Sequence, residues 1–120
     1  MRSKRRARLC LHRAKLLRLR HKAAGVLDDR QLLGHLLADS LSTFCVLFRH
    51  ALILDGVEAP LGKRQVVAKA AGHFQIDARP FERLFELREG KAAGQEVDLT
   101  EVLADYMKQI STVIEAVDRI

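Results

Sequence analysis

The most distinctive chemical feature of the sequence is a basic amino-terminal segment. Residues 1–22 hold ten lysines and arginines and no Asp or Glu, whereas the rest of the chain holds eleven basic and all fifteen acidic residues. A cationic helix of this kind is expected to bind a polyanion, an acidic partner or the acidic face of its own fold. The segment has no aromatic residue to stack on bases, so we expect weak and non-specific polyanion contacts. The contact residues that we predict are Arg2, Lys4, Arg5, Arg6 and Arg8.

The later basic residues of this segment leave a second interpretation open. Arg13, Arg18 and Arg20 would lie on the solvated face of a long helix and pair with acidic residues of the same chain. The candidate partners are Asp28, Asp29, Asp39 and Glu115. We expect residues 1–8 to be disordered or frayed, and the helix to be packed from Arg13 onward. Membrane contact ranks below both interpretations because no Trp or Phe flanks the charges.

A second chemical candidate is the pair Arg30 and His35, which four residues separate. The spacing resembles the Arg-x4-6-His signature of HEPN-type ribonucleases, a helical family. In that family the arginine grips a phosphate and the histidine acts on the attacking 2′-hydroxyl, and the resemblance implies these roles here. The pair lies near the start of a helix, whereas the family's motif usually opens the last long helix. We therefore favour the simpler interpretation, in which Arg30 is exposed in a first turn and His35 lies on a helix flank.

No other residue pattern in the sequence indicates an enzyme. The five histidines lack metal-ligand spacing, so we predict no metal and no cofactor. The sequence has no Gly-rich phosphate loop, no nucleophile elbow and no Asp-x-Asp pair to hold magnesium, so we expect no nucleotide transfer by this chain alone. Cys10 and Cys45 lie among leucines, which favours buried thiols in a reducing cytoplasm.

Apolar periodicity predicts helices throughout the chain and no strand. The expected helices span about residues 3–24, 28–54, 66–74, 77–89 and 98–120. Asp28 is expected to cap the second helix, with Leu27 and Leu32 forming a hydrophobic staple. Asp77 and Asp98 are expected to cap the fourth and fifth helices.

The apolar positions of the long helices indicate how they pack. Those of the first helix recur at steps of four and three: Cys10, Ala14, Leu17, His21 and Ala24. The second helix is apolar around much of its girth, which is typical of a central core helix. Its most apolar part, 41–54, is too short to cross a bilayer. The last helix keeps a heptad of Leu99, Leu103, Tyr106, Ile110, Val113, Val117 and Ile120, so it should pack along a long neighbour. We predict one domain over residues 1–120, an all-α, up-and-down bundle of three long and two short helices.

Three segments in this order resemble a known family: residues 14–20 (AKLLRLR), 41–49 (LSTFCVLFR) and 81–88 (FERLFELR). They are similar to the helical C-terminal region of small bacterial proteins whose amino-terminal half is a nucleotidyltransferase domain of the DNA polymerase β type. The resemblance runs from Arg13 to the end of the chain, about nine-tenths of its length. It implies a helical accessory domain that closes a substrate cleft or mediates dimer contacts.

The catalytic Gly-Ser turn and paired aspartates of that family are absent from the sequence, so the resemblance carries no catalytic residue onto this chain. Our leading hypothesis is a non-catalytic module that binds or completes a nucleotidyltransferase. Its expected partner is the catalytic domain or chain, and a homodimer is an alternative. Two further hypotheses remain open: a HEPN-type ribonuclease toxin, and a basic module that binds nucleic acid without sequence preference.

Overall fold

The computed structural model describes residues 2–90 and 98–119 of the chain, with side chains described from residue 12 onward. These residues form five helices, which are α1 (Arg2–Ala24), α2 (Arg30–Leu54), α3 (Lys63–Phe74), α4 (Arg79–Arg88) and α5 (Leu99–Asp118). No strand occurs in the described ranges. The prediction of an all-α helical bundle with three long and two short helices is confirmed.

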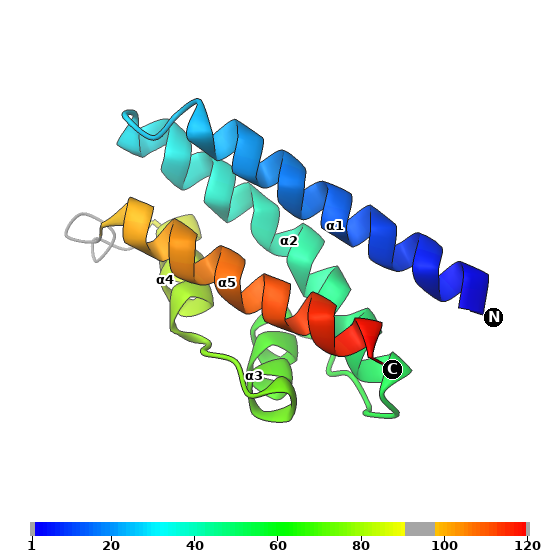
Figure 1. The fold of residues 1–120 in the computed structure, drawn as a ribbon. Coiled ribbons are helices and arrows are strands. Elements are labelled where there is room, and N and C mark those ends of the chain that lie inside the picture. The colour runs from blue at the N-terminus through cyan, green and yellow to red at the C-terminus, as the bar shows by residue number, and fades with distance from the viewer. Residues whose placement is uncertain (1, 91–97, 120) are drawn as a thin grey trace.

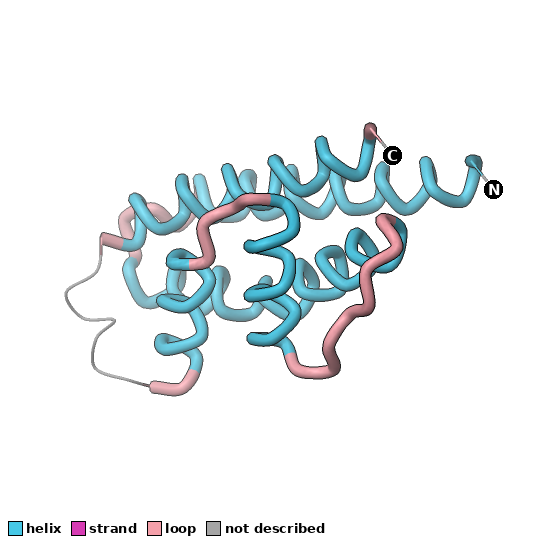
Figure 2. Tube along the Cα trace, turned by 90° about the horizontal axis from the view of Figure 1, so that it is seen from below, coloured by secondary structure: helices cyan, strands magenta, loops and turns pink. Residues whose placement is uncertain are grey.

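The three long helices α1, α2 and α5 lie alongside one another (Figure 1). Helix α1 runs in the opposite direction to α2 and α5, so α1 begins and α5 ends at the same end of the bundle. The short helices α3 and α4 pack on α2 and α5, on the side away from α1 (Figure 2). Helix α2 therefore has neighbours on most of its circumference, as its broad apolar surface predicts.

The core is centred on α2, as the sequence predicts. Six apolar residues that form a broad stripe along α2 are at most 2% exposed: Leu33, Leu37, Leu41, Phe44, Phe48 and Leu52. Aromatic rings join this stripe to the neighbouring helices, because Phe44 lies edge-on to Tyr106 of α5 and Phe48 lies edge-on to Phe81 of α4. The ring centroids are 6.0 and 5.2 Å apart, within the range of favourable aromatic pairs.

By length and composition α2 is also the one described helix that could cross a membrane, with a mean hydropathy of 1.4 over its most apolar window. Half of that window is buried within the fold. Core helices pass the same test, and the buried stripe of α2 shows that this helix forms the core of the bundle.

The caps of the helices agree with the sequence in one case and differ in two. Asp98 caps α5 as predicted, since its carboxylate accepts hydrogen bonds from the amides of Thr100 and Glu101. The prediction of Asp28 as the cap of α2 is wrong by one residue: Asp29 is the N-cap, and its carboxylate accepts from the amide of Leu32 at 3.1 Å. Leu27 and Leu32, the residues of the predicted staple, lie outside the buried core and are about half exposed.

The N-cap of α4 is Ala78 rather than the predicted Asp77. The carboxylate of Asp77 accepts instead from the backbone amide and the guanidinium of Arg79, both at 2.9 Å. These hydrogen bonds lower the pKa of Asp77 below its usual value.

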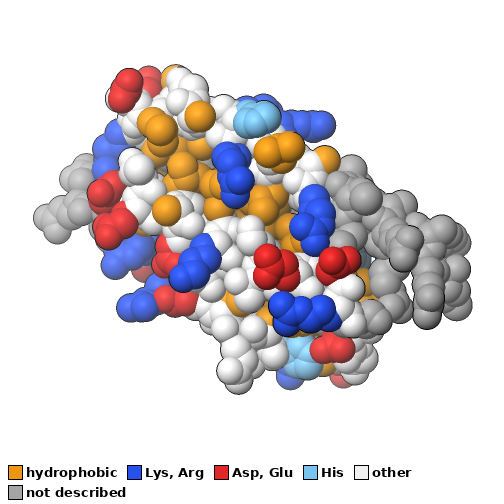
Figure 3. Space-filling view, in the orientation of Figure 1, with side chains coloured by type: hydrophobic (Ala, Val, Ile, Leu, Met, Phe, Trp, Pro, Cys, Tyr) orange, Lys and Arg blue, Asp and Glu red, His pale blue; other side chains and the backbone are white. Residues whose placement is uncertain are grey.

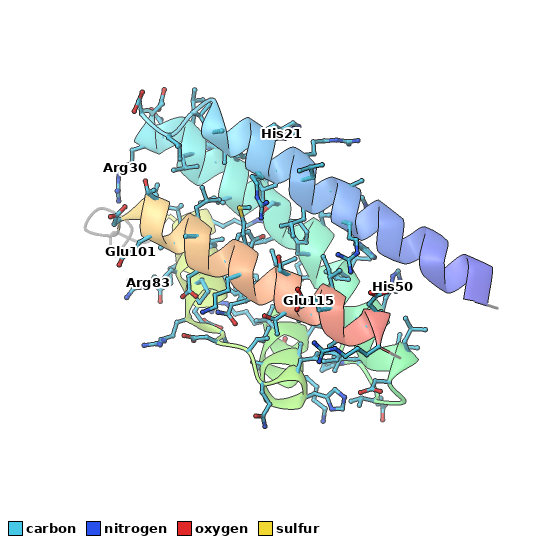
Figure 4. All side chains as sticks on the ribbon, viewed as in Figure 1. His21, Arg30, His50, Arg83, Glu101 and Glu115 are labelled. Carbon is cyan, nitrogen blue, oxygen red and sulfur yellow. The ribbon has the colours of Figure 1, made fainter. Side chains whose placement is uncertain are left out.

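The predicted apolar stripe of α1 is wrong at its four described residues, and the side chain of the fifth, Cys10, lies outside the described part of the structure. Ala14, Leu17, His21 and Ala24 are exposed, and Figure 4 shows His21 on the outer side of the helix. The residues that face the core are His12, Leu16, Leu19 and Ala23. A shift of one residue turns a helical stripe by about 100°. The stripe with Leu16 and Leu19 faces the core because two leucines bury more apolar area than the single leucine of the predicted stripe.

Candidate functional site

The orientation of α1 leaves two flanks of this helix available beside its buried stripe. Residues at steps of three and four share a helix face, which places Arg20 and Ala24 on the flank beside α5. Lys15, Arg18 and Lys22 share the other flank, beside α2. Each flank borders a cavity, and the two cavities differ in chemistry.

The first cavity is an apolar groove between α1 and α5, which we call the α1–α5 groove. Its volume is about 440 Å³, and its lining residues are Arg20, Ala24, Leu27, Thr100, Leu103, Ala104, Met107, Lys108 and Ser111. Leu103 and Met107 are buried core residues that also line the groove. Leu27 is 45% exposed. Figure 3 shows hydrophobic side chains along the hollow between α1 and α5, with Lys and Arg side chains beside them.

The charges that line the α1–α5 groove are all positive. Arg20 comes from α1 and Lys108 from α5, and no Asp or Glu is among the lining residues. Neither cation forms an ion pair within the part of the chain that the structure describes. The groove is therefore an apolar surface with two cations at its edge, neither of which is in an ion pair among the described residues.

The second cavity lies between α1 and α2, and we call it the α1–α2 pocket. Its volume is about 260 Å³, and its lining residues are Lys15, Arg18, Leu19, Lys22, Leu36, Asp39, Ser40, Thr43 and Phe44. Three cations stand on the α1 side, and a carboxylate and two hydroxyl groups stand on the α2 side. The apolar floor is formed by Leu19 and Phe44, which are both buried.

Intramolecular ion pairs of α1 differ from the sequence-based interpretation. Arg13 pairs with Asp118 of α5 at 3.5 Å, and not with any of the four acidic residues proposed above. Arg18 and Arg20 form no ion pair among the described residues. Most of the positive charge on the described part of α1 is thus left for solvent or for a ligand.

The pair Arg30 and His35 lies on the surface at the start of α2. Both side chains are exposed, and five residues along a helix correspond to about 140° around its axis. Neither residue lines the α1–α5 groove or the α1–α2 pocket. Figure 4 shows Arg30 at the outer edge of the bundle. The structure places the pair on a helix, and its ribonuclease role stays a prediction.

The predicted polyanion contacts Arg2, Lys4, Arg5, Arg6 and Arg8 belong to the helical backbone of α1. Their side chains lie outside the described part of the structure, so their role and the state of residues 1–8 stay predictions. The sequence did not lead us to predict that Lys15, Lys22 and Ser40 line a common pocket. Their signal was the 3–4 spacing of the cations on one helix, but nothing local showed that α2 lies opposite.

The described residues hold no group of three or more His, Cys, Asp and Glu side chains that could bind a metal ion. Cys45 is buried as predicted, and burial raises the pKa of its thiol above the usual value. This favours the neutral thiol over the nucleophilic thiolate.

Comparisons of this chain with protein-family models, curated proteins and solved structures find no match.

Proposed function

We propose that this chain is a non-catalytic helical module that binds a partner protein by taking up a helix of that partner in the α1–α5 groove. The observation that carries the proposal is an apolar groove of about 440 Å³ on a bundle whose principal apolar stripes are otherwise buried. Exposed apolar surface with a polar rim is typical of protein–protein contact sites.

The shape and the charge of the groove support an acidic helix as its occupant. The groove lies between two long antiparallel helices, and an amphipathic helix can lay its apolar face along such a seam. Arg20 and Lys108 would face acidic residues on the flanks of that helix. A second copy of this chain would bring the same two cations against each other, so we favour a different protein over a homodimer.

The identity of the partner rests on the resemblance described above. A module similar to the helical region of small nucleotidyltransferases would bind a nucleotidyltransferase catalytic domain or chain. Such a partner would supply the metal-binding carboxylates that this sequence lacks. The division of labour is then a catalytic partner and a helical module that holds it or its substrate cleft in place.

Substitution in the groove tests this proposal. Leu27→Arg should weaken binding of a nucleotidyltransferase chain encoded beside this gene by about tenfold or more, because it adds a cation to an apolar contact. Ile53→Arg is the matched control, since Ile53 is similarly exposed but does not line the groove. Affinity is measured by isothermal titration calorimetry, and thermal unfolding checks that both variants fold.

The proposal is contradicted if Leu27→Arg binds like the parent chain, or if both variants lose affinity equally. Sedimentation of this chain alone as a dimer that Leu27→Arg dissociates would show that a second copy occupies the groove. A third outcome is that no neighbouring nucleotidyltransferase binds, while a glutamate-flanked amphipathic peptide still binds in the groove. That result would contradict only the identity of the partner.

A further inference from the structure

The α1–α2 pocket lies at the surface of the bundle, and its lining residues Arg18, Lys22 and Asp39 are exposed. Lys15, Arg18 and Lys22 follow one another at steps of three and four, which brings three cations onto one wall of a single cavity. None of them forms an ion pair in the part of the chain that the structure describes. The three cations outnumber the single carboxylate of the cavity, Asp39, so an anion in the cavity would lower their mutual repulsion.

The opposite wall carries hydrogen-bonding groups of defined orientation. The hydroxyl of Ser40 donates to the carbonyl of Leu37 at 2.7 Å, so the Tyr106 hydroxyl donates to Ser40 at 2.6 Å. One lone pair of the Ser40 oxygen remains as an acceptor. Thr43 forms no side-chain hydrogen bond among the described residues, and its hydroxyl can donate or accept.

Asp39 decides what kind of anion suits this pocket. Its carboxylate lines the same cavity as the three cations, yet no ion pair joins it to any of them. A carboxylate repels a bare phosphate but accepts hydrogen bonds from hydroxyl groups. A wall of cations facing a wall of Asp, Ser and Thr therefore matches a molecule that has a phosphate at one end and hydroxyl groups at the other.

We propose that the α1–α2 pocket binds a small phosphorylated polyhydroxyl compound, such as a sugar phosphate. The phosphate lies against Lys15, Arg18 and Lys22, and the ligand's hydroxyl groups donate to Asp39 and Ser40. The cavity volume of about 260 Å³ is just below the range of pockets for drug-sized ligands and suits one small molecule. The site is separate from the α1–α5 groove and does not depend on the partner proposed for that groove.

Ribose 5-phosphate is the probe for this site. Titration into the full chain at about 0.15 M salt, followed by isothermal titration calorimetry, should show saturable binding. Arg18→Gln should weaken it by about tenfold, the usual effect of losing one charge-assisted hydrogen bond. Arg20→Gln is the matched control, because Arg20 carries the same charge on the other flank of α1. Arg20→Gln should leave the affinity within about twofold of the parent value, since its distance and salt screen it from the pocket.

A second variant tests the role of the carboxylate. Asp39→Asn should weaken ribose 5-phosphate relative to inorganic phosphate, because it removes the acceptor for ligand hydroxyls together with the repulsion of bare phosphate. Equal losses for Arg18→Gln and Arg20→Gln would overturn the proposal, since only net charge would then matter. The absence of saturable ribose 5-phosphate binding would overturn it as well. If a single-stranded oligonucleotide binds more tightly and displaces ribose 5-phosphate, the three cations bind a nucleic-acid backbone and the proposal is overturned.

Discussion

At the scale of single residues, the most consequential polar contact in the core joins α5 to α2. Tyr106 is fully buried, and its hydroxyl has one partner, Ser40, which passes the chain of hydrogen bonds on to the carbonyl of Leu37. Burial raises the pKa of Tyr106 above its usual value, so the phenol stays neutral and acts as a donor. The same serine lines the α1–α2 pocket, so one side chain both ties two helices together and shapes the candidate site.

Two substitutions of this pair should differ in their effects on stability. Tyr106→Phe removes one buried hydrogen bond and should lower the free energy of unfolding by about 1 kcal/mol. Ser40→Ala leaves the buried Tyr106 hydroxyl without its acceptor and should cost more, about 1–3 kcal/mol. Urea unfolding of both variants and of the double variant measures this. Equal losses, or a smaller loss for Ser40→Ala, would show that the phenol finds another partner.

At the scale of secondary-structure elements, helix starts depend on which side chain reaches the free amides of the first turn. Asp28 and Asp29 are neighbours with the same chemistry, and either could cap α2 by composition. The structure selects Asp29, which leaves Leu32 outside the core and starts the buried stripe at Leu33. A difference of one residue in the cap therefore decides which leucines are buried in the first turn.

The two aspartates provide a matched pair for measuring this cap. Asp29→Ala should lower the free energy of unfolding by about 1 kcal/mol, because the amide of Leu32 loses its hydrogen bond. Asp28→Ala removes the same charge near the same helix end without removing the cap, and should change stability by less than about 0.5 kcal/mol. Thermal or urea unfolding compares them. A larger loss for Asp28→Ala would restore the cap predicted from the sequence.

At the scale of the whole molecule, the charge is divided between one helix and the rest of the bundle. The net charge of +6 arises from residues 1–22, while the remaining chain carries an excess of acid. In the structure Arg13 meets that acidic body at Asp118, and the cations on both flanks of the helix are left for ligands. One flank borders an apolar groove and the other a polar pocket, so a single helix contributes to two sites with different ligand chemistry.

Deletion of residues 1–8 tests how the positive charge is used. We expect the deletion to remove most of the salt-sensitive binding to a labelled single-stranded oligonucleotide, because affinity for nucleic acid scales with the number of phosphates neutralised. The melting temperature should change little, since we predict that the helix is packed in the bundle only from Arg13 onward. Fluorescence anisotropy over a range of salt concentrations and thermal unfolding give the two readouts. Unchanged oligonucleotide binding, or a large fall in melting temperature, would contradict this division.

The sequence by itself determined the burial of those helices whose apolar pattern is compatible with only one packing arrangement. Helix α5 has a well-marked cap at Asp98 and a strict heptad, and the cap and the heptad positions from Leu99 to Val117 are found as predicted. The last predicted position, Ile120, lies outside the described residues. Helix α2 is apolar over so much of its surface that only a central position buries it, and the structure places it at the centre of the core as predicted. The apolar residues of α5 lie on one face, and those of α2 lie on nearly all faces. Local periodicity is therefore sufficient to predict how these two helices are buried.

Only the tertiary structure decided the rotation of α1 and, with it, both candidate sites. This helix carries leucines on more than one face, and periodicity cannot tell whether Leu16 or Leu17 turns inward. The choice depends on how much area each face buries against α2 and α5. The cavities combine residues far apart in the chain, such as Lys22 with Asp39 and Leu27 with Met107. Such neighbours are created by the packing of whole helices, and no local sequence pattern records them.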